Sequence, residues 1–202
     1  MPPRTALTQL ADGSYFDLLD PNPRQINADM ICDGLSKIHR FNGRTIRPYT
    51  VLEHSLRAAW FFDRVMAEDY PHPSQMRRAV LLHDAQEVFM GDIISPTKQA
   101  LRALGGGEAL YKLEQGLDRA IELAFGLPHL ILNHPAIKDC DLMALEWERR
   151  NVKNPMGGRE TPPEWPLLPE RHLREVDQMQ EWFPKGDLRA LSQSWLNGLE
   201  AP

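Results

Sequence analysis

One short stretch of the chain places groups that could bind a metal or move a proton next to residues typical of a core. Residues 81–98 read LLHDAQEVFMGDIISPTK and contain His83, Asp84, Glu87 and Asp92. Charged side chains are rarely fully buried unless they are paired or hold a metal. The stretch therefore predicts that these groups are either paired with other charged residues or hold a metal.

Two other segments supply further candidate ligands. His54 lies in YTVLEHSLRAAWFF, and Asp139 and Asp141 lie in PAIKDCDLMAL; both segments have helical periodicity. Divalent metals accept imidazole nitrogen and carboxylate oxygen together, and coordination positions left for water are typical of catalytic sites. Side chains of adjacent helical residues point about 100° apart. His83 and Asp84 would therefore share one ion only in a crevice between helices.

Each candidate ligand, taken alone, has an ordinary structural explanation. His54 on the flank of an apolar stripe fits a hydrogen-bonded core histidine, and Asp84 fits a solvated helix residue. Asp141 could simply pair with Lys138. Only the combination of these residues favours a metal site.

The segments EHSLRAA, HDAQEVFMGDIISPTK and IKDCDLMAL resemble the H…HD…D signature of HD-domain metal-dependent phosphohydrolases. They are most similar to the branch of bacterial 5′-deoxynucleotidases and phage deoxynucleoside triphosphate triphosphohydrolases. The match runs from about Asp29 to Glu148, and its spacing H-D-x-x-E-x-x-x-G-D-x-x-x-P-x-K is more specific than a bare HD pair. The resemblance implies that the metal ligands are His54, His83, Asp84 and Asp141.

Asp141 rather than Asp139 matches the family's last ligand, because that ligand is followed by small and apolar residues, as in DLMAL. Helical periodicity agrees, since Ile137, Asp141 and Leu145 share one face. Glu87 lies four residues after His83, which would place both on one face of a continuous helix. The resemblance implies that Glu87 orients water.

The resemblance also implies roles for residues around the ion. Asp92 would act as general base or acid. Which of Asp92 and Glu87 takes which step of proton transfer stays open. Arg40, followed by Phe41, matches an arginine and aromatic pair beside the nucleotide, and arginine suits phosphate oxygens. Lys98 is a second phosphate candidate, although a solvated lysine fits equally well.

Together with these residues, the resemblance implies a nucleotide phosphohydrolase that uses one divalent metal ion. Mixed histidine and aspartate ligation leaves Mn, Co, Mg, Fe, Ni and Zn open. The resemblance favours a 5′-deoxynucleotidase that converts deoxynucleoside 5′-monophosphates to deoxynucleoside and phosphate. The loop HRFNGRT departs from the Arg-Trp form of that branch, so two alternatives stay open: a dNTP triphosphohydrolase of the same fold, and a non-catalytic, metal-containing nucleotide-sensing module.

The elements that must position these groups read as helices almost throughout, which predicts one all-α domain over residues 1–202. The resemblance implies that this domain is a single HD-domain helical bundle. Its motif core is about 29–148, and C-terminal helices within 170–199 pack on it. We expect helices over 27–41, 49–70, 75–90, from 95 to the glycines at 105–107, and over 108–126, 135–152, 170–183 and 187–199. Thr50 and Glu53 have capping-box spacing, and Ser74 is a candidate N-cap. Residues 154–169 read as irregular, and EWERR at 146–150 as a solvated face.

Composition narrows the partners and the compartment. The formal net charge of −5 gives no general attraction to nucleic acid. Two cysteines without paired spacing fit a reducing compartment, and no apolar run approaches the ~18 residues of a membrane helix. We therefore expect a cytoplasmic protein with a small nucleotide substrate and no membrane partner, and the resemblance implies a homodimer.

Overall fold

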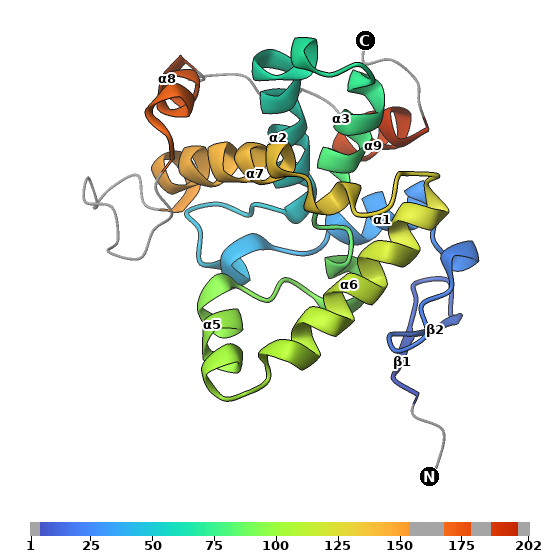
Figure 1. Cartoon of the computed structure of the whole chain (residues 1–202). Helices are drawn as coiled ribbons and strands as arrows, with labels where there is room; N and C mark the ends of the chain where they lie inside the picture. The colour runs from blue at the N-terminus through green and yellow to red at the C-terminus, as the bar shows by residue number, and fades with distance from the viewer. Residues whose placement is uncertain (1–4, 154–167, 179–186, 198–202) are drawn as a thin grey trace.

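The computed structural model describes residues 5–153, 168–178 and 187–197, and in these ranges the chain is mostly helical, as predicted (Figure 1). The short strands β1 (Leu7–Gln9) and β2 (Tyr15–Asp17) form an antiparallel hairpin. The helices are α1 (Ala28–Leu35), α2 (Val51–Val65), α3 (Pro73–Leu81), α4 (Glu87–Met90), α5 (Ser95–Ala103), α6 (Gly107–Ala124), α7 (Pro135–Glu148), α8 (Glu170–Gln178) and α9 (Leu188–Leu196). Short 3-10 turns lie at Pro23–Gln25, Arg40–Gly43, Ala67–Asp69 and Ile131–Asn133, and a π turn at Arg149–Lys153 follows α7.

Helix α2 is the centre of the bundle. The predicted capping box is present: the Thr50 side chain accepts a hydrogen bond from the Glu53 N–H, and the Glu53 carboxylate accepts one from the Thr50 N–H. Most of the helix is buried, and it packs against α3 and α7, with α7 running across it in Figure 1. The core made by Leu56, Phe61 and Phe62 therefore fixes the helix that carries His54.

The continuous helix predicted over residues 75–90 is wrong. α3 starts at Pro73, with no side-chain cap from Ser74, and ends at Leu81. The backbone then forms three-residue turns, in which the Ala85 and Glu87 N–H groups donate to the carbonyls of Leu82 and Asp84, before α4 begins at Glu87. His83 and Asp84 thus lie in a turn between two helices, and Glu87 does not share a helix with His83.

The predicted first helix is also shorter than expected. α1 ends at Leu35, and the chain turns back so that the Arg40 N–H donates to the Tyr49 carbonyl and the Val51 N–H to the Ile38 carbonyl. This pairing closes a loop in front of α2. The loop brings Arg40 to the same end of α2 as His54.

The remaining helices surround this centre. α5 begins at Ser95, as predicted, with Pro96 in its first turn, and the glycines after it separate α5 from α6, with Gly105 at φ +86°. α8 contacts α7, and α9 contacts α1, α2 and α3. Most of the predicted irregular segment 154–169, and the ends of both C-terminal helices, lie outside the described residues. Within the described ranges, no helix combines the length and apolarity that a membrane crossing requires.

Candidate metal centre

Four predicted ligand residues meet where α2, the turn after α3, and α7 converge. His54 Nε2 lies 3.2 Å from His83 Nε2 and 3.6 Å from Asp84 Oδ2, and the His83 and Asp84 atoms are 3.3 Å apart. Asp141 Oδ1 lies 3.3 Å from His54 Nε2 and 4.0 Å from His83 Nε2. The atoms from His54, His83 and Asp84 all lie within 4.8 Å of one another, a grouping that could hold a metal ion.

The break between α3 and α4 explains how two adjacent residues reach one point. In a continuous helix, His83 and Asp84 would point about 100° apart. In the turn, His83 Nε2 and Asp84 Oδ2 instead approach each other and His54 together. Asp84 and Asp141 stay partly exposed while His54 is fully buried, so the centre opens to one side.

The second nitrogen of each imidazole is held by an acceptor that faces away from the centre. His54 Nδ1 lies 2.6 Å from Glu148 Oε1, and His83 Nδ1 lies 2.7 Å from the Val80 carbonyl oxygen. Both acceptors require a proton on Nδ1, which in the neutral ring leaves the Nε2 lone pair pointing inward. Two such lone pairs face each other and two carboxylates, so a cation between them fits the donor set.

Without an ion, burial and the neighbouring charges shift the pKa values of the residues in the centre. Burial and the Arg40 charge act to lower the pKa of His54, but Glu148 and Asp141 outweigh them and raise it to about 9. Burial acts to raise the pKa of Asp84, yet His83, His54 and Arg40 hold it below its usual value. The pKa of Asp141 is likewise held down, chiefly by His54 against the effect of burial. The carboxylates of Asp84 and Asp141 are therefore ionised, and a nearby cation would stabilise them.

Glu87 and Asp92 lie beside this centre with carboxyl groups that bind protons more tightly than usual. Glu87 is only 6% exposed, and its Oε2 has no hydrogen-bond partner among the described residues. Burial, followed by Asp84 and Asp92, raises the pKa of Glu87 well above its usual value. Burial also raises the pKa of Asp92, whose Oδ2 accepts a hydrogen bond from the Phe41 N–H at 3.1 Å.

Arg40 points into the centre, where it is held by carboxylates. Its Nη1 lies 3.2 Å from Asp84 Oδ2, while Nε and Nη2 lie 3.3 and 3.2 Å from Glu148 Oε2. Phe41 adopts a left-handed conformation with φ 56°, and its ring lies 5.3 Å from the Arg40 guanidinium carbon and 5.0 Å from Lys153 Nζ. The predicted arginine and aromatic pair therefore lies at the rim of the centre.

Lys98, the other predicted phosphate contact, is paired with an acidic residue of α6. Its Nζ lies 2.7 Å from Glu114 Oε1. One helical turn further along α6, Asp118 has a buried Oδ1 without a hydrogen-bond partner among the described residues. Burial, together with Glu114, Glu122 and Asp84, raises the pKa of Asp118 to about 7. The Glu114, Asp118 and Glu122 spacing, four residues each, is the sequence signal that could have indicated this acidic face.

Glu148 corrects the prediction of a solvated face at residues 146–150. Its side chain is fully buried, and Glu146 beside it is only 6% exposed. Glu146 pairs with Arg149 and Arg150, whereas Glu148 contacts His54 and Arg40. Its position seven residues after Asp141, on the same face of α7, is the signal that could have found it.

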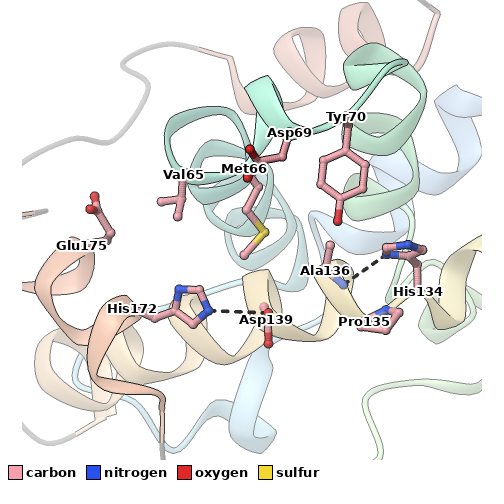
Figure 2. A pocket seen from close by; sticks show the side chains of 10 residues that line it. All are labelled: Val65, Met66, Asp69, Tyr70, His134, Pro135, Ala136, Asp139, His172 and Glu175. Carbon is pink, nitrogen blue, oxygen red and sulfur yellow. Dashed lines mark hydrogen bonds and ion pairs between the residues drawn. The ribbon is translucent and has the colours of Figure 1, made fainter.

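Asp139, the alternative to Asp141, points to a different part of the molecule (Figure 2). It lies 3.5 Å from His172 of α8 and lines a cavity of about 660 Å³ between α7, α8 and the end of α2. Apart from Asp139, none of the described residues that line this cavity is a predicted ligand, acid–base group or substrate contact. Asp141, in contrast, faces His54 and also pairs with Lys138 at 2.6 Å.

Comparison with known proteins finds relatives but no matching family model. The chain is 35% identical over 157 residues to the uncharacterized protein RCAP_rcc00048 of Rhodobacter capsulatus. This alignment covers 74% of each of the two chains. It is also 28% identical over 154 residues to the uncharacterized protein YfdR of Escherichia coli, over 76% of this chain and 72% of that one. The chain belongs to the family of the Rhodobacter capsulatus protein RCAP_rcc00048.

Proposed function

We propose that this protein is an HD-domain phosphohydrolase that uses one divalent ion to hydrolyse deoxynucleoside 5′-monophosphates to deoxynucleoside and phosphate. The observation that carries the proposal is the convergence of His54, His83, Asp84 and Asp141 with both imidazole Nε2 atoms turned inward. A purely structural ion would not call for the acid–base carboxyls of Glu87 and Asp92 beside it.

A divalent ion bound by these residues would act as a Lewis acid toward a phosphate oxygen and lower the pKa of a nearby water. Glu87 suits the role of proton acceptor, because its unpartnered, buried carboxylate has a raised proton affinity. Hydrolysis adds the water's hydroxyl group to phosphorus, breaks the bond to the 5′ oxygen, and transfers a proton to that oxygen. Asp92, with its own raised pKa, is the second group that could hold this proton.

The charges around the centre favour a monophosphate over a triphosphate. Arg40 is engaged by Asp84 and Glu148, and Lys98 by Glu114. Asp84 and Asp141, whose pKa values are held down, add negative charge at the same centre. A substrate with fewer phosphate charges would meet less repulsion there, since unscreened like charges in a partly buried site oppose binding.

The proposal is tested by stripping the protein of metal, resupplying each candidate ion, and assaying ribo- and deoxynucleoside mono- and triphosphates. We expect ion-dependent release of orthophosphate from deoxynucleoside monophosphates. Release of intact triphosphate would replace the monophosphatase with a triphosphohydrolase. Ion binding with no release from any nucleotide would reject hydrolysis and support a nucleotide-sensing module.

A further inference from the structure

Glu148 is a buried charge that contacts both His54 and Arg40 at the candidate metal centre. Its side chain is 0% exposed, and a buried carboxylate is costly unless it is paired and hydrogen-bonded. One oxygen, Oε1, faces His54 Nδ1 at 2.6 Å. The other, Oε2, faces Arg40 Nε and Nη2 at 3.3 and 3.2 Å.

These contacts join two candidate ligands through one carboxylate. His54 binds Glu148 directly, and Asp84 Oδ2 is reached through Arg40 Nη1 at 3.2 Å. Glu148 also stands on α7 with Asp141, two helical turns away, so the helix that supplies one ligand orients another on α2. The order His54, Glu148, Arg40, Asp84 is a continuous path of charged hydrogen bonds.

We infer that Glu148 is a positioning residue that fixes His54 with Nδ1 protonated and Nε2 free for the ion, and that holds Arg40 against Asp84. An ionised carboxylate can only accept hydrogen bonds, so it selects the Nδ1–H form of the ring. Such partners behind a metal-binding histidine raise the ligand's basicity and restrict its rotation. The inference rests on the proposed divalent-ion site, and it adds a residue that neither binds the ion nor touches substrate.

The test compares two isosteric substitutions on the same helix in the full chain. Glu148→Gln removes the charge that holds His54 and Arg40, whereas Glu146→Gln changes a similarly buried glutamate whose partners are Arg149 and Arg150. Binding of Co²⁺ is measured by calorimetry and by its visible absorption spectrum. We expect Glu148→Gln to weaken Co²⁺ binding about 10- to 100-fold and to alter the spectrum, while Glu146→Gln leaves both unchanged.

The outcomes separate this inference from the function on which it rests. A folded Glu148→Gln protein that binds Co²⁺ with unchanged affinity and spectrum would overturn the positioning role and leave the hydrolase proposal standing. Failure of the natural sequence to bind Co²⁺ or any other candidate ion would overturn both. If Glu148→Gln does not fold, nitrogen NMR of the natural sequence with Zn²⁺ decides: we expect His54 to keep its Nδ1 proton and bind through Nε2, and binding through Nδ1 would overturn the inference.

Discussion

Asp84 contacts both histidines of the centre as well as Arg40. Its Oδ2 lies 3.6 Å from His54 Nε2, 3.3 Å from His83 Nε2 and 3.2 Å from Arg40 Nη1. An ion placed among these atoms would have Asp84 as its principal source of negative charge from the turn. The positive charge of Arg40 balances Asp84 only in part, because Arg40 also pairs with Glu148.

We expect Asp84→Ala to abolish both ion binding and turnover, since it removes a ligand and leaves Arg40 without one of its partners. Asp139→Ala is the matched control, because Asp139 lies on α7 but faces His172 rather than His54. Calorimetry with Mn²⁺ or Co²⁺ and a phosphate-release assay measure the two effects. An unchanged rate in Asp84→Ala would contradict the assignment.

Glu87→Gln should separate ion binding from chemistry. Glu87 is buried beside the ligands and has an unpartnered oxygen, so neutralising it removes a proton acceptor without removing a ligand. We expect ion affinity to be retained and turnover to fall by about 10²- to 10⁴-fold. Urea unfolding should show no loss of stability, because Oε2 has no hydrogen-bond partner among the described residues that the substitution could remove. Full activity in this variant would exclude Glu87 as the acid–base group.

The ion-free protein should lose stability as the pH rises from 6.5 through about 9. The pKa of His54 is raised from 6.5 to about 9, so the folded state binds its proton more tightly than the unfolded chain. That contribution is complete below pH 6.5 and disappears above the folded pKa. An ion must displace the same proton, so ion affinity should increase over this window.

Urea unfolding of chelated protein at several pH values measures this dependence. His54→Gln should remove it, whereas His39→Gln, at an exposed histidine in the neighbouring loop, should leave it unchanged. A pH dependence that survives in His54→Gln would show that another group is responsible.

The sequence identifies the candidate ligand residues better than it identifies the residues that position them. His54, His83, Asp84 and Asp141 carry a recognisable spacing, and the structure brings all four together. Glu148 lies in a charged run that reads as solvated, and its burial depends on His54 and Arg40, which are 94 and 108 residues away. The seven-residue spacing from Asp141 places Glu148 on the same face of α7, but it does not specify contacts with residues that far away in the sequence.

At the scale of elements, the turn between α3 and α4 is the feature that creates the centre. Residues 81–90 contain no proline or glycine, so local propensity favours a continuous helix. A tertiary contact and a local one oppose that preference: His83 Nε2 faces His54 on α2, and His83 Nδ1 bonds to the Val80 carbonyl three residues earlier. The capping box of α2 and the proline at the start of α5 were predictable, because both depend on neighbouring residues only.

α4 is held at its place by a close approach to α1. A Cβ added at Gly34 would lie 2.7 Å from Val88 Cγ1, and the branched Val88 side chain has little freedom to move. We expect Gly34→Ala to destabilise the protein by about 1–3 kcal/mol through overpacking. Displacement of α4 should also lower turnover, because α4 carries Glu87.

Gly116→Ala in the interior of α6 is the control for this substitution. A Cβ there would meet only Pro21 Cγ, at 4.0 Å, so alanine should stabilise the helix by about 0.5–1 kcal/mol. Chemical denaturation measures both changes. Equal stability of the two variants would show that α1 and α4 do not constrain each other.

At the scale of the whole molecule, the centre ties together segments that are distant in sequence. Its candidate ligands come from α2, the turn after α3, and α7, which meet only in the folded bundle. An ion that binds the folded state alone should stabilise it by about 2.7 kcal/mol at 100 times its dissociation constant. For a chain of this size, each 1 kcal/mol corresponds to about 2–4 °C in melting temperature.

We therefore expect excess Mn²⁺ to raise the melting temperature by several degrees and a chelator to reverse the change. Asp84→Ala should melt at the same temperature with and without the ion. A shift of equal size in Asp84→Ala would mean that the ion stabilises the protein from another place.

We propose that one ion bound in this centre makes the protein a phosphohydrolase. The most direct test adds Mn²⁺ or Co²⁺ stepwise to metal-stripped full chain with a deoxynucleoside monophosphate, and follows bound ion and released phosphate together. We predict that phosphate release rises in proportion to bound ion and levels off at one ion per chain. Release that is independent of bound ion, or no release once one ion is bound, would contradict the claim.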